Sequence, residues 1–212
     1  MKVVVFGSGG QARVVSEILL HDKKVELVGF IDPLTKNPKE KIFGLPILGG
    51  FEVIPSLIKK GVQGFVVGVG DNKIRAKRFK ELIEAGLEPV KAVHPTATIT
   101  KEVIIGKGTV VAMGAMIATK AKIGKNVIIN SGAIVEHETT IGDHVHVAPG
   151  AVLAGRVRVK KYTLVGLRAV VKEFLTIGER SIVGAGAVVV KDVADKMVVV
   201  GIPAKKLRNN DK

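Results

Sequence analysis

The sequence predicts a chain of two unlike parts, a short α/β domain with a parallel sheet followed by an all-β domain built as a parallel β-helix. Patterns of buried strand, glycine turn and helix alternate over the first part of the chain. From Val93 to Val189, every sixth residue is Val or Ile, with Leu153 as the one exception. We place the boundary where the periodicity changes, giving domains 1–90 and 91–212.

The N-terminal domain is expected to contain three strands and two helices. The stretch KVVVFGSGGQARVVSEILLH, residues 2–21, has the pattern of a buried strand, a glycine turn and an amphipathic helix. VELVGFID (25–32) and GFVVGVGDN (64–72) are further strands, and KIRAKRFKELIEAG (73–86) is a second helix. This alternation favours a small parallel sheet covered by helices.

The first glycine turn matches a nucleotide-binding pattern. Gly7, Gly9 and Ala12 fit G-x-G-x-x-A, and Asp32 ends the next strand, where it could accept a ribose hydroxyl. An NAD oxidoreductase would need two such halves, and this domain supplies one. We therefore expect a Rossmann-like domain that binds a single nucleotide, with a ligand-free tight turn as the alternative.

Five residues are expected to contact that nucleotide-linked ligand. The helix N-terminus at Gly9, Gly10 and Gln11 can receive an anionic or polar group. Asp32 can accept hydrogen bonds from an amine or a hydroxyl. Gly70, at the end of the third strand, lets a ligand lie against the backbone.

The six-residue repeat defines the second domain. The residue four after each Val or Ile anchor, such as Ala97, Val103 and Ala187, is nearly always small or β-branched. Two inward positions separated by an outward one are typical of a strand, so the remaining pair of residues forms a corner. Glycine or asparagine often occupies that corner, as at Gly108 and Asn126, which suits positive φ. Three strand-and-corner units close a triangular coil of 18 residues, and successive coils pair through their backbones.

Composition limits the classes of function. Lys and Arg total 33 against 19 Asp and Glu, and the net charge of +14 attracts anions such as phosphorylated substrates. Aromatic residues make up only 4%, so stacking platforms for nucleic acid are not expected. The chain has no cysteine, which excludes disulfides and thiolate nucleophiles. No membrane-spanning run and no signal-peptide pattern is found, so we expect a cytoplasmic protein.

Three of the five histidines fall at positions 137, 144 and 146. By the repeat, His137 and His144 occupy corners and project from the prism, and His146 occupies an outward strand position. Metal ligands would have to converge on one ion, whereas side chains on successive outer edges diverge. We therefore predict no metal site there. A histidine beside a carboxylate, as in His137-Glu138, is suited to act as a general base near neutral pH.

The repeat and several motifs resemble a known family. The motifs are GSGGQ, FID, VGVGDNKIR, INSGAIVEHE, HVHVAPGA and VGIPAKK. Together they resemble the sugar O- and N-acetyltransferases related to sialic acid O-acetyltransferase, within the hexapeptide-repeat acyltransferases. The resemblance covers almost the whole chain and implies a left-handed coil. One departure is Gln11, where the family usually has histidine.

The resemblance also implies roles for individual residues. His137 matches the catalytic base and Glu138 the carboxylate that supports it. His146, Leu167 and Ala185 match positions that contact acetyl-CoA, and Lys205, with Lys206, could pair with CoA phosphates or form part of a solvated tail.

The 18-residue coil adds a geometric expectation. Gly155 lies one coil after His137, so it should stack over that histidine, admit the thioester and offer its N–H to the oxyanion. His146 lies on another face of the prism, so a ligand that touches both histidines needs two chains. This agrees with the homotrimers of the family, whose sites lie between subunits.

We therefore predict acetyl transfer from acetyl-CoA to the 4-amino group of a nucleotide-linked amino-deoxy sugar, by direct attack and with His137 as base. One alternative is O-acetylation of sialic acid or a related sugar. Another, from a different class, is a nucleotide-binding scaffold without catalysis, against which the His137-Glu138 pair argues. The nucleotide and the sugar are left open.

Overall fold

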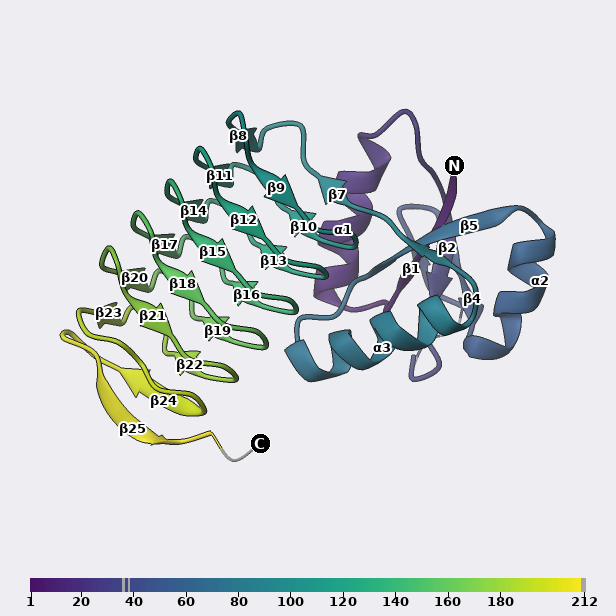
Figure 1. The fold of residues 1–212 in the computed structure, drawn as a ribbon. Helices are drawn as coiled ribbons and strands as arrows, with labels where there is room; N and C mark the ends of the chain where they lie inside the picture. Colours follow the sequence, from purple (N-terminus) through teal and green to yellow (C-terminus); the bar gives the residue numbers. More distant parts are fainter. Residues whose placement is uncertain (36, 38, 211–212) are drawn as a thin grey trace.

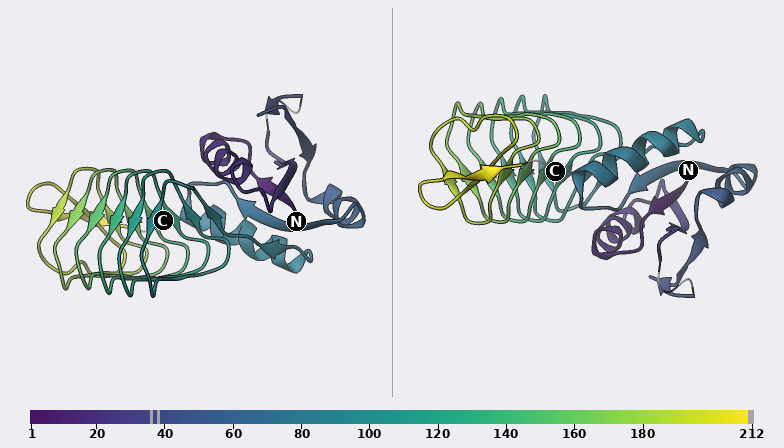
Figure 2. Two further views of the ribbon diagram at one scale, coloured as in Figure 1. Left: turned by 90° about the horizontal axis from the view of Figure 1, so that it is seen from above. Right: turned by 90° about the horizontal axis from the view of Figure 1, so that it is seen from below.

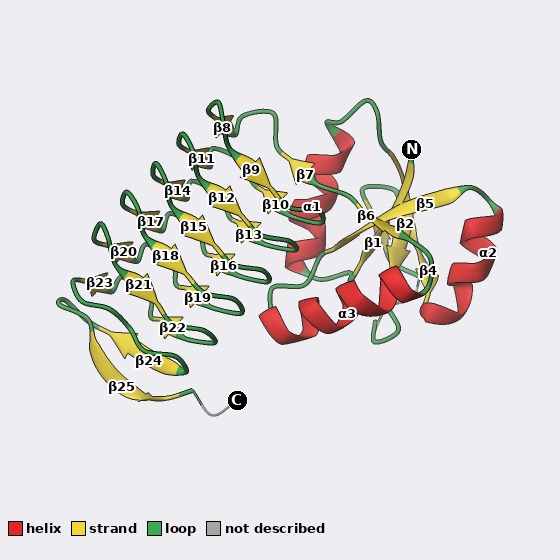
Figure 3. Cartoon of the chain, in the orientation of Figure 1, coloured by secondary structure: helices red, strands yellow, loops and turns green. Residues whose placement is uncertain are grey.

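The computed structural model describes residues 1–210 except residues 36 and 38. Figure 1 shows a helix-containing N-terminal domain joined to a stack of β coils, and Figure 3 shows that all three α-helices belong to the former. In chain order, the N-terminal elements are β1 (Lys2–Phe6), α1 (Gly10–Leu20), β2 (Glu26–Ile31), β3 (Lys41–Ile42), β4 (Leu45–Gly49), a 3-10 turn (Phe51–Val53), α2 (Ile54–Lys59), β5 (Val62–Val67), α3 (Asn72–Glu84) and β6 (Glu88–Pro89).

The N-terminal sheet has the strand order β3-β4-β2-β1-β5-β6. The pairs from β4 through β6 are parallel, and only β3 runs antiparallel, against β4. The predicted parallel sheet is therefore confirmed. The elements β3, β4, α2 and β6 were not predicted, because they are short and carry little periodicity.

The second domain is a prism with three faces of stacked strands, each two residues long except the last two, β24 and β25. Face 1 contains β7 (Ala92–Val93), β10 (Val110–Val111), β13 (Ile128–Ile129), β16 (His146–Val147), β19 (Leu164–Val165), β22 (Ile182–Val183), β24 (Met197–Val200) and β25 (Lys205–Asn209). Face 2 contains β8 (Thr98–Ile99), β11 (Met116–Ile117), β14 (Ile134–Val135), β17 (Val152–Leu153), β20 (Val170–Val171) and β23 (Val188–Val189). Face 3 contains β9 (Ile104–Ile105), β12 (Lys122–Ile123), β15 (Thr140–Ile141), β18 (Arg158–Val159) and β21 (Thr176–Ile177).

The register of the faces confirms the 18-residue coil. On face 1, Val110 pairs with Ile128, and Ile128 pairs with His146, always in parallel. The anchors and the small second track fill the interior, and buried threonines on that track, such as Thr163, donate to backbone carbonyls. Val93 is an exception with 38% exposure, because it belongs to the first coil and no earlier coil covers it.

The corners have positive φ three residues after the anchor, as the repeat predicts. The glycines and the asparagine singled out from the sequence, Gly108, Gly114, Asn126, Gly132, Gly150 and Gly186, all have positive φ. Five of these corners have glycine, whereas ten have another residue: Glu102, Lys120, Asn126, Glu138, His144, Arg156, Tyr162, Arg168, Phe174 and Arg180. The cost of left-handed backbone at these residues is offset by the ladder hydrogen bonds of the coils on either side.

The two domains share a hydrophobic core. Face 1 side chains such as Val110 and Ala112 pack in one cluster with Val3 and Val15 of the N-terminal domain. The N-terminal domain thus covers one end of the prism (Figure 2). The first sheet ends at Pro89, and the first strand of the prism begins at Ala92.

Arg75 of α3 joins the two domains. Its side chain is almost fully buried and donates to the backbone carbonyls of Asn126 (3.1 Å), His144 (2.9 Å) and Val145 (3.2 Å) in the prism. It also donates to the carbonyl of Gly70 (3.0 Å) in its own domain. Burial lowers the pKa of Arg75 to about 9, so the guanidinium is still charged at neutral pH. A buried charge with this many acceptors fixes how the domains meet.

Candidate active site

His137 and Glu138 lie at the corner between faces 2 and 3, directly after β14. His137 Nδ1 is 3.2 Å from Glu138 Oε2, and each side chain is nearly half exposed. The same Glu138 oxygen accepts a hydrogen bond from Arg156 Nε at 2.9 Å. The hydrogen bond from Arg156, followed by that from His137, holds the pKa of Glu138 below its usual range. An ionised Glu138 requires a proton on Nδ1, which leaves the lone pair of Nε2 free to accept a proton.

Gly155 lies where the 18-residue register puts it. A Cβ built on Gly155 would be 2.6 Å from both Nε2 and Cε1 of His137, so the imidazole lies directly against this glycine. The N–H of Gly155 donates to no acceptor among the residues that the structure describes. This corner therefore combines a base with a close backbone approach and a free donor.

His146 has a different environment on face 1. Its Nδ1 donates to the carbonyl of Gly70 at 3.3 Å, and its Nε2 accepts from the amide of Asn130 at 3.1 Å. Burial, with the charge of Arg75, lowers the pKa of His146 to about 4. His146 is therefore a neutral imidazole with a fixed tautomer at pH 7, unsuited to act as a base there. Asn130 and the contact with Gly70 were not anticipated from the sequence.

His144 lies at a corner, as the repeat predicts, but neighbouring side chains pack against its ring. It lies at the corner between faces 3 and 1, and its ring stacks on Tyr162 with centroids 5.0 Å apart. Phe79 of α3 meets it edge-on, and Asn126 donates to its Nδ1 at 2.9 Å. Burial lowers the pKa of His144. This histidine belongs to the packing between α3 and the prism.

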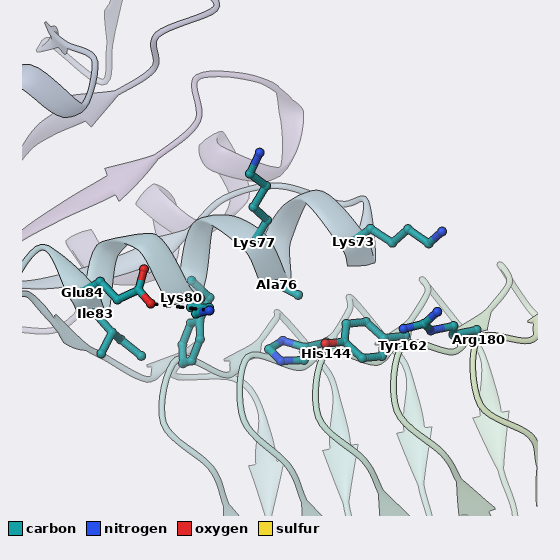
Figure 4. Close-up of a pocket in the computed structure, with 10 residues that line it drawn as sticks. Lys73, Ala76, Lys77, Lys80, Ile83, Glu84, His144, Tyr162 and Arg180 are labelled. Carbon is teal, nitrogen blue, oxygen red and sulfur yellow. Dashed lines mark ion pairs between the residues drawn. The ribbon is translucent and has the colours of Figure 1, made fainter. Parts of the chain in front are cut away.

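His144 also lines a groove of about 720 Å³ between α3 and the prism. Figure 4 shows His144, Tyr162 and Arg180 on successive loops, with Lys73 and Lys77 on the helix opposite. The guanidinium of Arg180 lies 5.4 Å from the ring centre of Tyr162. His144 and Arg180 thus cover the two faces of the Tyr162 ring. A planar ligand could stack on Tyr162 only by displacing one of them.

A cavity of about 340 Å³ lies at the carboxyl edge of the N-terminal sheet. It brings together all five residues predicted to contact the acceptor, which are Gly9, Gly10, Gln11, Asp32 and Gly70. It also contains Arg78 of α3, which the sequence analysis missed. The guanidinium of Arg78 lies over the rings of Phe6 and Phe51, at 5.5 and 5.4 Å.

Two of these acceptor residues have notable hydrogen bonding. Asp32 already accepts from the N–H (2.9 Å) and hydroxyl (2.6 Å) of Ser8 and from the N–H of Leu34 (3.0 Å). Its carboxylate thus shapes the glycine turn and keeps limited capacity for a ligand. The side-chain amide nitrogen of Gln11 is buried without a partner among the described residues, so a ligand oxygen could satisfy it.

A second cavity, of about 480 Å³, adjoins the first at Gly70. It contains His146 and Leu167 and extends to Tyr162 and Arg180. Ala185 lies one coil beyond Leu167, exposed at the corner between faces 1 and 2. Lys205 lies on β25, an exposed strand that extends face 1, so this segment is an ordered hairpin and not a tail.

One chain does not unite all the predicted site residues. His146 and Leu167 are near Gly70, whereas His137, Glu138 and Gly155 lie at a different corner of the prism. This separation is the one that the coil register predicts.

Another polar cluster could be considered for a metal. Glu17 Oε1 lies 2.9 Å from His21 Nε2 and 3.3 Å from His94 Nε2. However, the backbone N–H of Thr96 donates to His94 Nδ1 at 3.1 Å, so the proton of the neutral ring is on Nε2. That nitrogen donates to Glu17, so hydrogen bonds account for the proximity of the three side chains.

The fold and the His137 corner together define an acyltransferase of the hexapeptide-repeat class. Residues 2–82 match the PglD N-terminal domain, and residues 120–155 match the bacterial transferase hexapeptide (six repeats). A histidine-to-asparagine mutant of perosamine N-acetyltransferase from Caulobacter crescentus, solved with CoA and GDP-perosamine, is 34% identical, with a TM-score of 0.93 over 99% of this chain and 98% of that one. The chain belongs to this family of hexapeptide-repeat sugar N-acetyltransferases with a PglD-type N-terminal domain, which confirms both the fold class and the family resemblance.

Two curated relatives match over shorter segments. GDP-perosamine N-acetyltransferase of Escherichia coli O157:H7 is 30% identical over 139 residues, which are 63% of this chain and 61% of the relative. UDP-N-acetylbacillosamine N-acetyltransferase of Bacillus subtilis (strain 168) is 34% identical over 115 residues, 51% of this chain and 50% of the relative. The matched segments thus span between half and two thirds of these relatives. Among the described residues, no helix has the length and apolar character needed to cross a membrane.

Proposed function

We propose that this protein transfers the acetyl group of acetyl-CoA to the 4-amino group of a nucleotide-linked amino-deoxy sugar. The observation that carries the proposal is the His137–Glu138 pair lying against Gly155 at an exposed corner of the prism. The names of the relatives support an amino sugar linked to GDP or UDP. The complex of the C. crescentus enzyme supports CoA as the carrier of the acetyl group.

His137 is the proposed general base. Nδ1–H donates to the Glu138 carboxylate, so Nε2 accepts the proton that the sugar amine loses as its nitrogen attacks the thioester carbon. The carbonyl oxygen becomes an oxyanion, which the N–H of Gly155 could stabilise. As the C–S bond breaks, the imidazolium returns its proton to the leaving thiolate. No covalent enzyme intermediate is needed, and the chain has no cysteine to form one.

The acceptor is assigned to the cavity around the glycine turn. The N-terminus of α1 at Gly9 and Gly10 suits a phosphate group, and the buried amide of Gln11 can donate to a ligand oxygen. The carboxylate of Asp32 holds the glycine turn in place, and its remaining lone pairs can accept hydrogen bonds from the ligand. Gly70 borders both cavities, which gives the sugar a path from the nucleotide pocket toward His146.

The donor is assigned to the groove that begins at His146 and Leu167. His146 presents a neutral ring of fixed orientation, which suits a positioning contact to acetyl-CoA better than proton transfer. Ala185 continues the groove along the corner, and the exposed ammonium of Lys205 is available to a CoA phosphate.

A homotrimer is the proposed assembly. The outward positions of face 2 form an apolar stripe that no other part of the described chain covers: Met116, Ile134, Val152, Val170 and Val188. A second copy on this face would bury the stripe and bring a partner's corner to the half-site of this chain. Acetyl-CoA and nucleotide sugars are cytoplasmic metabolites, so we propose the cytoplasm as the compartment.

The deciding experiment compares acceptors. Purified protein is assayed with acetyl-CoA and either GDP-perosamine, UDP-N-acetylbacillosamine or the corresponding free amino sugars. We expect the free sugars to have a kcat/KM at least about a hundredfold lower, because remote binding energy positions the reacting amine. Equal kcat/KM with and without the nucleotide would contradict the proposal, and acetylation of sialic acid alone would favour the O-acetyltransferase. Binding of nucleotide without any acetylation would favour the scaffold.

A further inference from the structure

The corner that holds Glu138 contains a ladder of three side chains. Glu138, Arg156 and Phe174 occupy the same corner position in successive coils, and all three have positive φ near 60°. Arg156 Nε donates to Glu138 Oε2 at 2.9 Å, and the guanidinium carbon lies 5.4 Å from the ring centre of Phe174. Arg156 is thus held by an ion pair on one side and by an aromatic ring on the other.

The Glu138 carboxylate needs such support. Its side chain is 40% exposed, and a glutamate in that setting has several rotamers open to it. Glu138 Oε2 faces His137 Nδ1 and also accepts the hydrogen bond from Arg156 Nε. Its contact with the imidazole is the longer of the two, 3.2 Å against 2.9 Å, so Arg156 makes the tighter contact.

We propose that Arg156 is a positioning residue that holds Glu138 against His137, and thereby keeps the imidazole oriented with its Nε2 lone pair toward the acceptor amine. This inference rests on the proposed acetyl transfer. Arg156 does not touch the reacting atoms and moves no proton. It acts by keeping the carboxylate ionised and in one rotamer, in agreement with the lowered pKa of Glu138. Phe174 fixes Arg156 in turn.

Other charges surround this corner. Lys120 occupies the same corner position one coil before Glu138. The backbone N–H of His137 donates to Glu136 Oε2 at 3.4 Å, so Glu136 does not face the imidazole through this contact. Glu173 lies one coil after Gly155 and pairs with Lys172 at 3.8 Å. Among the described residues, Arg156 alone forms an ion pair with Glu138 besides His137.

The kinetic test is a double-mutant cycle. We expect Arg156→Ala to lower kcat about tenfold while KM for either substrate stays within about twofold. In a Glu138→Ala background, Arg156→Ala should have no further effect, because the carboxylate it positions is absent. Arg156→Lys keeps the charge and one donor, and should recover part of the loss. Phe174→Ala should cause a smaller decrease in kcat.

Arg158→Ala is the matched control, since Arg158 is an exposed arginine two residues away on face 3. It should leave kcat unchanged. An unchanged kcat in Arg156→Ala would overturn the proposal. A loss that persists in the Glu138→Ala background would also overturn it, because Arg156 would then act on the substrate directly.

A second measurement does not depend on activity. In a carbon-13 NMR titration of the side-chain carboxyl, the pKa of Glu138 should rise toward its ordinary value in Arg156→Ala and should not move in Arg158→Ala. A pKa that does not rise in Arg156→Ala contradicts the inference. If the wild-type protein acetylated no amino sugar, the proposed function would fail, but the titration would still decide whether Arg156 holds Glu138.

Discussion

His137 is exposed at the corner between faces 2 and 3, whereas His146, on face 1, is enclosed by the N-terminal domain. At His137 one ring nitrogen faces a carboxylate, and the other has no hydrogen-bond partner among the described residues. At His146 both nitrogens have protein partners, and burial beside Arg75 keeps the ring neutral. Two histidines in outward positions of the same prism thus differ in chemistry, because one is covered by the N-terminal domain and the other is exposed.

The first way to break this comparison is to remove the exposed histidine. We expect His137→Ala to lower kcat by about 10²–10⁴, since the amine loses its proton acceptor. Affinity for CoA, measured by calorimetry, should change little, because the proposed donor groove lies at another corner. Turnover within threefold of wild type would remove His137 from the role of base.

The second test concerns the enclosed histidine and the pH dependence of stability. His146 takes up its proton near pH 6.5 when unfolded and near pH 4 when folded, so acid favours the unfolded state between these values. The free energy of unfolding is therefore not reduced by His146 above pH 6.5. Protonation of His146 in the unfolded state lowers it by up to about 3 kcal/mol as the pH drops to 4.

Chemical denaturation between pH 4 and 7 measures this effect. His146→Asn should show a smaller loss of stability on acidification than the wild-type protein. Arg158→Ala, at an exposed arginine on face 3 that removes no histidine, is the control and should follow the wild-type curve. Parallel curves for wild type and His146→Asn would mean that His146 titrates normally in the fold.

The smallest expected effect comes from Gly155→Ala. The added methyl would lie 2.6 Å from the His137 ring, which has solvent beside it and can turn away. We expect kcat to fall about tenfold with little change in Tm, as the base leaves its working orientation. On a His137→Ala background the same change should cost nothing further. A full additive loss there would show that Gly155 acts independently of the imidazole, for instance through its N–H.

Much of the fold follows from the repeat, because a six-residue period states which side chains point inward and which residues make corners. The register also places Gly155 against His137, since both follow from the 18-residue count. Arg156 could have been found in the same way, one coil after Glu138. The five acceptor residues meet in one cavity because the carboxyl ends of parallel strands share an edge.

The environments of His144 and His146 could not be obtained this way. They depend on α3 lying across the prism, fixed by Arg75 through contacts to carbonyls 51 to 70 residues away. Periodicity says that a side chain points outward, but it does not say whether solvent or another domain lies outside. The short elements β3, β4 and α2 were missed because two to six residues carry no measurable period.

Equivalent positions in successive coils are separated by one strand spacing, about 4.8 Å. Positions such as Leu167 and Ala185 are separated by one such spacing, whatever their side chains. Inserting a single residue within a strand would exchange its inward and outward positions, unless a bulge or a longer corner takes up the extra residue. Duplicating a whole coil would instead lengthen the donor groove by one step and leave every residue facing as before. The length of the prism can therefore change in whole coils of 18 residues. A groove for a longer donor could arise by duplication of one coil, with the contacts within each coil kept.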